Sequence, residues 1–110
     1  MKNFVQDGET ITVVAPYALA SGDGCLVGSL FGVATAAAAN GATVEISTEG
    51  VFDLTTLGTD TPAQGAKAYW DNTAKRLTTT ATSNVLVGVF TEPKSAGVTV
   101  GRAYLDGCIR

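Results

Sequence analysis

The sequence predicts an all-β fold, a β-sandwich or a partly closed β-barrel built from short antiparallel strands. One observation is composition: Thr, Val and Ile occupy 31 of the 110 positions, and these β-branched residues suit a pleated sheet better than a helix. The other is the regular spacing of turn signals along the chain. Glycine follows a polar residue at short intervals, which is typical of tight turns between strands; the pairs are Asp7-Gly8, Asp23-Gly24, Asn40-Gly41, Glu49-Gly50 and Asp106-Gly107.

Between these turns lie runs of strand-forming residues. We expect strands at residues 4–5, 10–15, 24–27, 30–34, 43–47, 51–54, 67–70, 76–79, 85–90 and 98–105. In the run 43–47 the apolar residues Val44 and Ile46 alternate with polar ones, as in a strand with one buried face. Residues 86–90 are apolar throughout, which predicts an interior strand that is buried on both faces.

Two segments interrupt the strand pattern. Residues 34–40 are rich in Ala, but so short a run does not sustain an isolated helix, so we expect a loop with at most one helical turn. Residues 55–65 are polar and contain Gly and Pro, which predicts an exposed loop. Glycines at 28, 32 and 88 fall within or beside strands, where they indicate bulges or the close approach of another backbone. We interpret residues 1–110 as a single domain, with residues 1–6 as an N-terminal arm.

The charge pattern narrows the range of partners. Only 15% of the residues are charged and the net charge is −3, whereas about 25% is usual. Such a surface is consistent with coverage by another subunit. The 7 Lys and Arg residues are scattered, so the clustered cations that nucleic-acid binding needs are missing.

Few residues of the sequence are candidates for a catalytic, nucleotide-binding or metal site. The absence of histidine excludes Ser-His-Asp and Cys-His catalysis. The glycines of residues 21–29 are not followed by the Gly-Lys-Ser/Thr of a phosphate loop. Asp23 and Asp60 lie in turns, where aspartate usually bonds its own backbone. Asp53 lies on an expected strand with no catalytic motif beside it. We therefore expect no enzyme activity, no cofactor, and no catalytic or metal site.

The two cysteines, Cys25 and Cys108, lack the spacing of a metal site. We interpret them as small buried thiols, and a disulfide between them stays open. Residues 18–20 imitate a signal-peptidase site, but Pro16 interrupts the apolar run and Asp7 and Glu9 precede it. No run approaches the length of a membrane span, so we expect no membrane partner and an intracellular protein at synthesis.

The most polar segment, AYWDNTAKRLTTT at residues 68–80, holds the single Trp of the chain, Trp70. Asp71, Asn72 and Thr73 are favoured turn residues, and expected strands flank them, so we predict a β-hairpin with a loop of four or five residues. Trp70 then covers either the core or a subunit interface. The alternative is a glycan-binding module, with Trp70 as an aromatic platform and Asp71 and Asn72 bonding sugar hydroxyls.

Nearly the whole chain resembles a known family. The segments MKNFVQDGETITVVAPYALASGDGCLVGSLFGVA, GVFDL and AKAYWDNTAKRLTTTATSNVLVGVF resemble, in the same order, the phage capsid cement (head decoration) proteins of the DUF2190 type. The YWDNTAKRLTTTAT segment is the longest match. Cys25 and Cys108 depart from the small aliphatic residues expected there.

This resemblance implies a non-enzymatic structural protein of a tailed phage or prophage. It implies binding to the major capsid protein on the outside of the capsid, often as a homotrimer, and a location on the virion after assembly in the host cytoplasm. The family implies no catalytic residue. As interaction residues we expect Phe4 and Val5, two apolar side chains of the N-terminal arm, and Trp70.

Overall fold

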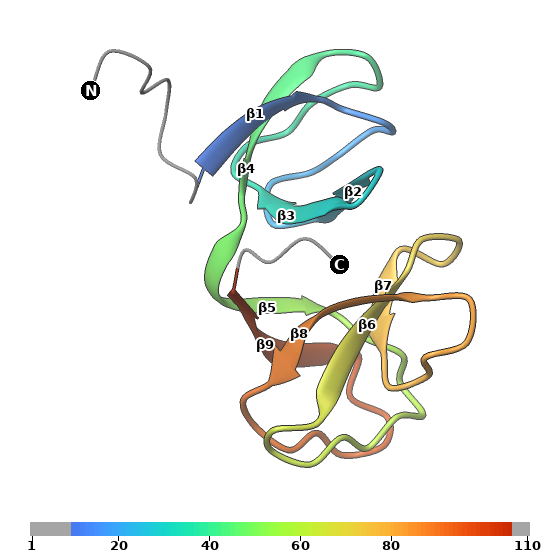
Figure 1. Ribbon diagram of the computed structural model, residues 1–110. Coiled ribbons are helices and arrows are strands. Elements are labelled where there is room, and N and C mark those ends of the chain that lie inside the picture. Colours follow the sequence, from blue (N-terminus) through green and yellow to red (C-terminus); the bar gives the residue numbers. More distant parts are fainter. Residues whose placement is uncertain (1–9, 107–110) are drawn as a thin grey trace.

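The computed structural model describes residues 10–106 (Figure 1). These residues form strands β1 (Thr10–Val14), β2 (Gly24–Val27), β3 (Leu30–Ala34), β4 (Thr43–Ser47), β5 (Glu49–Thr55), β6 (Lys67–Asp71), β7 (Arg76–Thr78), β8 (Val85–Phe90) and β9 (Val100–Asp106). Each strand overlaps one expected from the sequence, and the prediction of an all-β fold is confirmed. The expected strand at residues 4–5 lies outside the described residues.

The strands form two antiparallel sheets, one above the other in Figure 1. The upper sheet has the order β1-β4-β3-β2. Val44 and Ile46 of β4 are buried while Thr43 and Glu45 are exposed, as the alternation predicts. Together with Cys25 and Leu19 they form a small core on one side of this sheet, and the loop before β2 covers it, because Leu19 bridges Ala38.

The lower sheet has the order β5-β9-β8-β6-β7 and curls toward closure. Its two edge strands meet at one end, where Thr56 bridges Leu77 and the Leu57 amide donates to the Leu77 carbonyl at 2.8 Å. Of the two architectures that the sequence left open, this sheet is therefore a partly closed barrel. The interior position expected for residues 86–90 is confirmed, because β8 lies between β9 and β6. The expected burial on both faces is wrong, because Val87, Gly88 and Phe90 are buried while Leu86 and Val89 are partly exposed.

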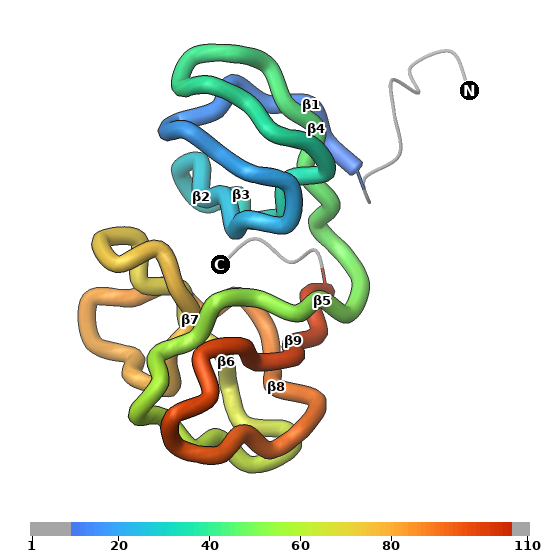
Figure 2. The backbone as a smooth tube through the Cα atoms, turned by 180° about the vertical axis from the view of Figure 1, so that it is seen from behind, coloured from blue at the N-terminus to red at the C-terminus, as the bar shows by residue number. Residues whose placement is uncertain are grey.

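The two sheets share a core. Leu54, Trp70, Leu77, Phe90 and Leu105 fill the barrel, and Val33 of the upper sheet belongs to the same buried cluster. The chain passes from β4 to β5 through Thr48 alone. Figure 2 shows this passage from behind, with the hairpin of β2 and β3 facing the lower sheet. The connection is short and the shared cluster is apolar, so packing of the β2–β3 hairpin holds the sheets together.

The glycine predictions had different outcomes. A Cβ at Gly88 would lie 2.1 Å from the Tyr104 carbonyl oxygen, and one at Gly32 would lie 2.8 Å from the Ser47 oxygen, so close backbone approach is confirmed at both. Gly28 instead turns the chain between β2 and β3 with φ of 59°, a value that glycine adopts easily. A bulge does occur, where Ala68 pairs with Gly88 but Tyr69 pairs with Leu86.

The loops expected at residues 34–40 and 55–65 are present over slightly shifted ranges, because Ala34 still belongs to β3 and Thr55 to β5. Thr56, within the loop expected to be exposed, is buried. Residues 35–42 and 57–66 contain only isolated bridges, bends and turns, and the Ala-rich segment forms no helical turn. Within residues 10–106 no helix has the length and apolarity needed to cross a membrane.

Candidate functional site

The first candidate site is the hairpin of β6 and β7, and local hydrogen bonds explain its shape. The Asp71 carboxylate accepts from the amides of Thr73 and Ala74 at 3.0 and 3.1 Å, which is the side-chain turn that aspartate favours. The Lys75 amide donates to the Asp71 carbonyl at 2.7 Å, and Lys75 takes a positive φ of 59°. The predicted hairpin with a loop of four or five residues is confirmed, since four residues separate Asp71 of β6 from Arg76 of β7. The hydrogen bonds of Asp71 stabilise this loop.

Trp70 points into the protein from this hairpin. Its side chain is only 2% exposed, its ring centroid lies 5.0 Å from that of Phe31 on the upper sheet, and its Nε1 donates to Asn72 Oδ1 at 3.0 Å. Of the two positions that the sequence left open, Trp70 therefore occupies the core. The sugar-platform hypothesis needs an exposed ring and a free Asn72, and this burial does not support it.

A small hollow of about 120 Å³ lies beside Trp70, where the two sheets meet. Lys75 Nζ lies 4.3 Å from the centroid of the Tyr17 ring across this seam, a cation–π contact. Lys75 also donates to the Asn72 carbonyl. The Tyr17 hydroxyl donates to the Gly24 carbonyl at 2.8 Å, and burial raises the pKa of this hydroxyl. Of these contacts, only that between Lys75 and Tyr17 joins the two sheets, because the two hydrogen bonds each lie within one half of the structure.

The carboxylates considered from the sequence have separate structural partners. Asp23 Oδ2 accepts from the Ala20 amide at 2.9 Å. Asp60 Oδ2 accepts from the Thr78 hydroxyl at 2.7 Å and the Thr79 amide at 2.9 Å, so it joins the loop after β5 to β7. Residues 10–106 hold no group of three or more His, Cys, Asp or Glu side chains close enough to bind a metal ion.

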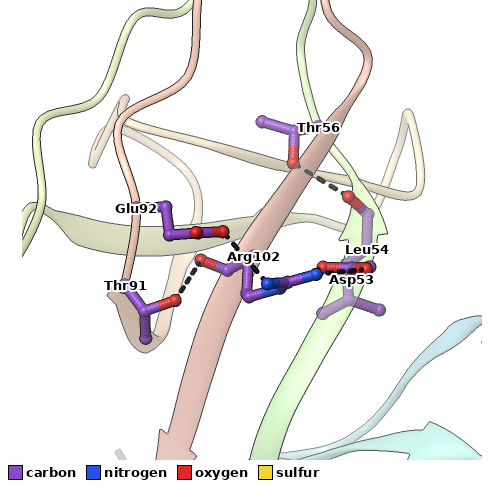
Figure 3. A network of polar contacts seen from close by, with 6 residues as sticks. All are labelled: Asp53, Leu54, Thr56, Thr91, Glu92 and Arg102. Atoms are coloured by element: carbon purple, nitrogen blue, oxygen red, sulfur yellow. Dashed lines mark hydrogen bonds and ion pairs between the residues drawn. The ribbon is translucent and has the colours of Figure 1, made fainter.

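The second candidate site is a polar network on the outer face of β5 and β9 (Figure 3). Arg102 Nε and Nη2 donate to the two oxygens of Asp53 at 2.9 and 3.2 Å, and Arg102 Nη1 lies 3.2 Å from Glu92 Oε2. The hydrogen bond from Arg102 holds the pKa of the Asp53 carboxyl below its ordinary value, and Asp53 and Glu92 raise the pKa of Arg102. Asp53 thus forms an ion pair with Arg102 and does not form a pair of carboxylates with another acid.

A hollow of about 340 Å³ adjoins this network, lined by Asp53, Glu92, Arg102, Val98 and Val100 among others. Lys94 forms part of its wall. Its side chain is buried, and Nζ donates to the carbonyls of Gly58, Ser95 and Val98 at 3.2, 3.1 and 2.7 Å. Lys94 and Arg102 could not be singled out from the sequence, because their partners depend on which strands and loops become neighbours.

Cys25 is fully buried and has a free thiol, and burial raises its pKa. The expectation of a small buried thiol is confirmed for this cysteine. Cys108 lies outside the described residues, and so do Phe4 and Val5 of the expected arm.

Comparisons with known proteins identify the family of this chain. No curated protein and no solved structure matches the chain significantly. One family model does match, described as phage cement protein, and it spans residues 5–105. These residues include both sheets, the Trp70 hairpin and the Arg102 network. Proteins of this family are structural and associated with phage capsids, and the match extends over almost the whole sequence, so the chain belongs to the phage cement protein family.

Proposed function

We propose that this chain is a non-enzymatic cement protein that binds the outside of an assembled phage capsid and stabilises it. The observation that carries the proposal is the family match over residues 5–105. The expected partner is the major capsid protein, the bound form is a homotrimer, and the location is the virion surface after assembly in the host cytoplasm. The structure supports this role by its rigidity, since both sheets are fixed through one shared core.

The physical basis of stabilisation is linkage. A protein that binds the assembled shell more tightly than its separated subunits shifts the equilibrium toward the shell. If each copy is part of a trimer, several weak contacts act together and raise the overall affinity without a large interface in any one chain. A low surface charge is compatible with this role, because it limits the number of charged groups that must lose water on binding.

The N-terminal arm remains part of the proposal. Thr10 pairs with Ser47 and Asp106 pairs with Glu49, so both ends of the described chain lie at the junction of β4 and β5. The first described residue, Thr10, therefore lies near one end of the outer face of β5 and β9. We propose that Phe4 and Val5 add to shell binding from there.

Co-sedimentation with empty shells of the phage that encodes this chain tests the function. We expect saturable binding at micromolar concentration, with a stoichiometry that matches trimers, and a trimer by light scattering. Shells that sediment without the protein at these concentrations would exclude the proposed role. Deletion of residues 1–5 is expected to weaken binding while the circular dichroism spectrum and melting temperature of the free protein stay the same.

A further inference from the structure

Exposed apolar side chains gather on one face of the described structure. Of the five large hydrophobic side chains that are exposed, all but Val14 belong to β5, to β9 or to the loop that enters β9; they are Val51, Val98, Val100 and Tyr104. Val51 is directly opposite Tyr104 in the antiparallel register, and Tyr104 is opposite Val89 of β8. Successive strand residues point to opposite faces, so Val51 and Tyr104 lie side by side on the outside of the barrel. We call this surface the β5–β9 face.

The same face concentrates negative charge. The outward positions of β5 and β9 that pair as Glu49 with Asp106 and Asp53 with Arg102 carry three carboxylates and one guanidinium. Glu92 adds a fourth carboxylate at Arg102. Among residues 10–106, these four carboxylates outnumber the two cations of this surface, Arg102 and the buried Lys94. The nearest outward lysine on the sheet, Lys67, is opposite Val89 and two strands away from β5.

The face is also hollowed. The cavity of about 340 Å³ beside the network is lined by the apolar Val98 and Val100 as well as by Asp53, Glu92 and Arg102. Lys94 holds the loop that carries Val98, because its ammonium donates to the Val98 carbonyl at 2.7 Å. Its charged lining is mixed, with the carboxylates of Asp53 and Glu92 beside the cations of Arg102 and Lys94. Such a hollow can accept an apolar side chain, or the stem of a Lys or Arg whose charged end reaches the carboxylates.

We propose that the β5–β9 face is the surface that docks on the capsid shell, against a patch that exposes apolar side chains surrounded by Lys or Arg. This inference rests on the proposed function and assigns its surface. Charge complementarity favours a basic partner over the alternatives. A second copy that used the same face would bring two sets of carboxylates together, since a two-fold contact is self-complementary. Nucleic acid, which is itself negatively charged, is disfavoured in the same way.

A matched pair of variants tests the assignment. Val51 and Val14 are exposed to 53% and 58%, and each lies on an edge strand of its sheet. We expect Val51→Lys to weaken co-sedimentation with shells at least about tenfold, because the new charge opposes a basic patch and tenfold corresponds to about 1.4 kcal/mol. Val14→Lys places the same change on the other sheet and is expected to bind as the wild type does. Both variants should keep the wild-type circular dichroism spectrum, since both positions are on the solvent side.

Salt and oligomeric state complete the test. Wild-type binding to shells should weaken as sodium chloride is raised, since rim charges are screened within about 10 Å at 0.1 M. If the wild type binds shells and Val51→Lys binds equally well, the assignment is wrong while the proposed function stands. If Val51→Lys dissociates the trimer in light scattering without loss of shell binding per chain, the face is a subunit interface and the assignment is again wrong. If the wild type itself does not bind, the proposed function fails first and the assignment fails with it.

Discussion

Gly24 of β2 lies directly against the ring of Trp70 of β6, at the contact between the two sheets. A Cβ atom built at Gly24 would be 2.5 Å from Cη2 and 2.7 Å from Cζ3 of Trp70. Trp70 cannot easily move away, because its Nε1 bonds Asn72 and its ring packs on Phe31. The absence of a side chain at residue 24 is thus what lets the upper sheet approach the barrel.

Gly24→Ala is therefore expected to lower the free energy of unfolding by about 1–3 kcal/mol, the usual cost of overpacking a core. Chemical denaturation followed by Trp70 fluorescence measures this change. Gly58→Ala is the control, because its Cβ would meet only Thr99 Cγ2 at an ordinary 3.6 Å, and we expect it to be neutral or slightly stabilising. Equal stability of the two variants would contradict the close contact at Trp70.

Lys94 is expected to matter for stability although it is a single lysine in a loop. Lys94→Met removes the donor for three carbonyls, those of Gly58, Ser95 and Val98, and a buried group without a partner costs about 1–3 kcal/mol. Thermal unfolding should show a clear fall in melting temperature. Lys67→Met makes the same exchange at an exposed strand position and should change little; a Lys94→Met variant as stable as Lys67→Met would contradict this role.

The Cys25 thiol is expected to be protonated and unreactive in the folded protein. Burial raises its pKa, and the thiolate is the form that reacts. Because the folded pKa lies above the unfolded one, the resulting stabilisation is present below the unfolded pKa and is lost as the pH rises through the folded value. In a Cys108→Ser variant, a thiol reagent should label Cys25 slowly in buffer and quickly in denaturant. Rapid labelling of the folded protein in buffer would show that the thiol is accessible.

The ion pair between Asp53 and Arg102 is expected to make the free energy of unfolding depend on pH in the direction opposite to that expected for Cys25. Arg102 lowers the pKa of Asp53 in the folded state, so the pair stabilises the fold above the unfolded pKa of about 4 and this effect is lost as the pH falls through the folded value. The difference in unfolding free energy between wild type and Asp53→Asn should be small, because both side chains are half exposed and screened by water. It should shrink further on acidification; a difference that grows in acid would contradict the assignment.

The sequence predicted the strands well because their signals are local. Turn residues such as Asp71 and Asn72 bond the backbone beside them, and the alternation of Val44 and Ile46 needs only one strand to be recognised. Gly32 and Gly88 were likewise noticeable because glycine is unusual inside a strand.

The contacts between distant strands could not be predicted in this way. Trp70 and Tyr69 occupy adjacent positions on β6, and nothing in the sequence says which of the two faces the core. Asp53 and Arg102 are separated by 49 positions and meet only because β9 pairs with β5. The β5–β9 face has the same origin, since Val51 and Tyr104 become neighbours through the order of the strands.

The central claim, that the chain binds and stabilises an assembled capsid, is tested most directly by calorimetry of empty shells with increasing amounts of the protein. Linkage predicts a shell melting temperature that rises with concentration, since free ligand at 100 times its dissociation constant stabilises by about 2.7 kcal/mol per site. Val14→Lys should give the full rise and Val51→Lys a smaller one. An unchanged shell melting temperature at saturating wild-type protein would contradict the account.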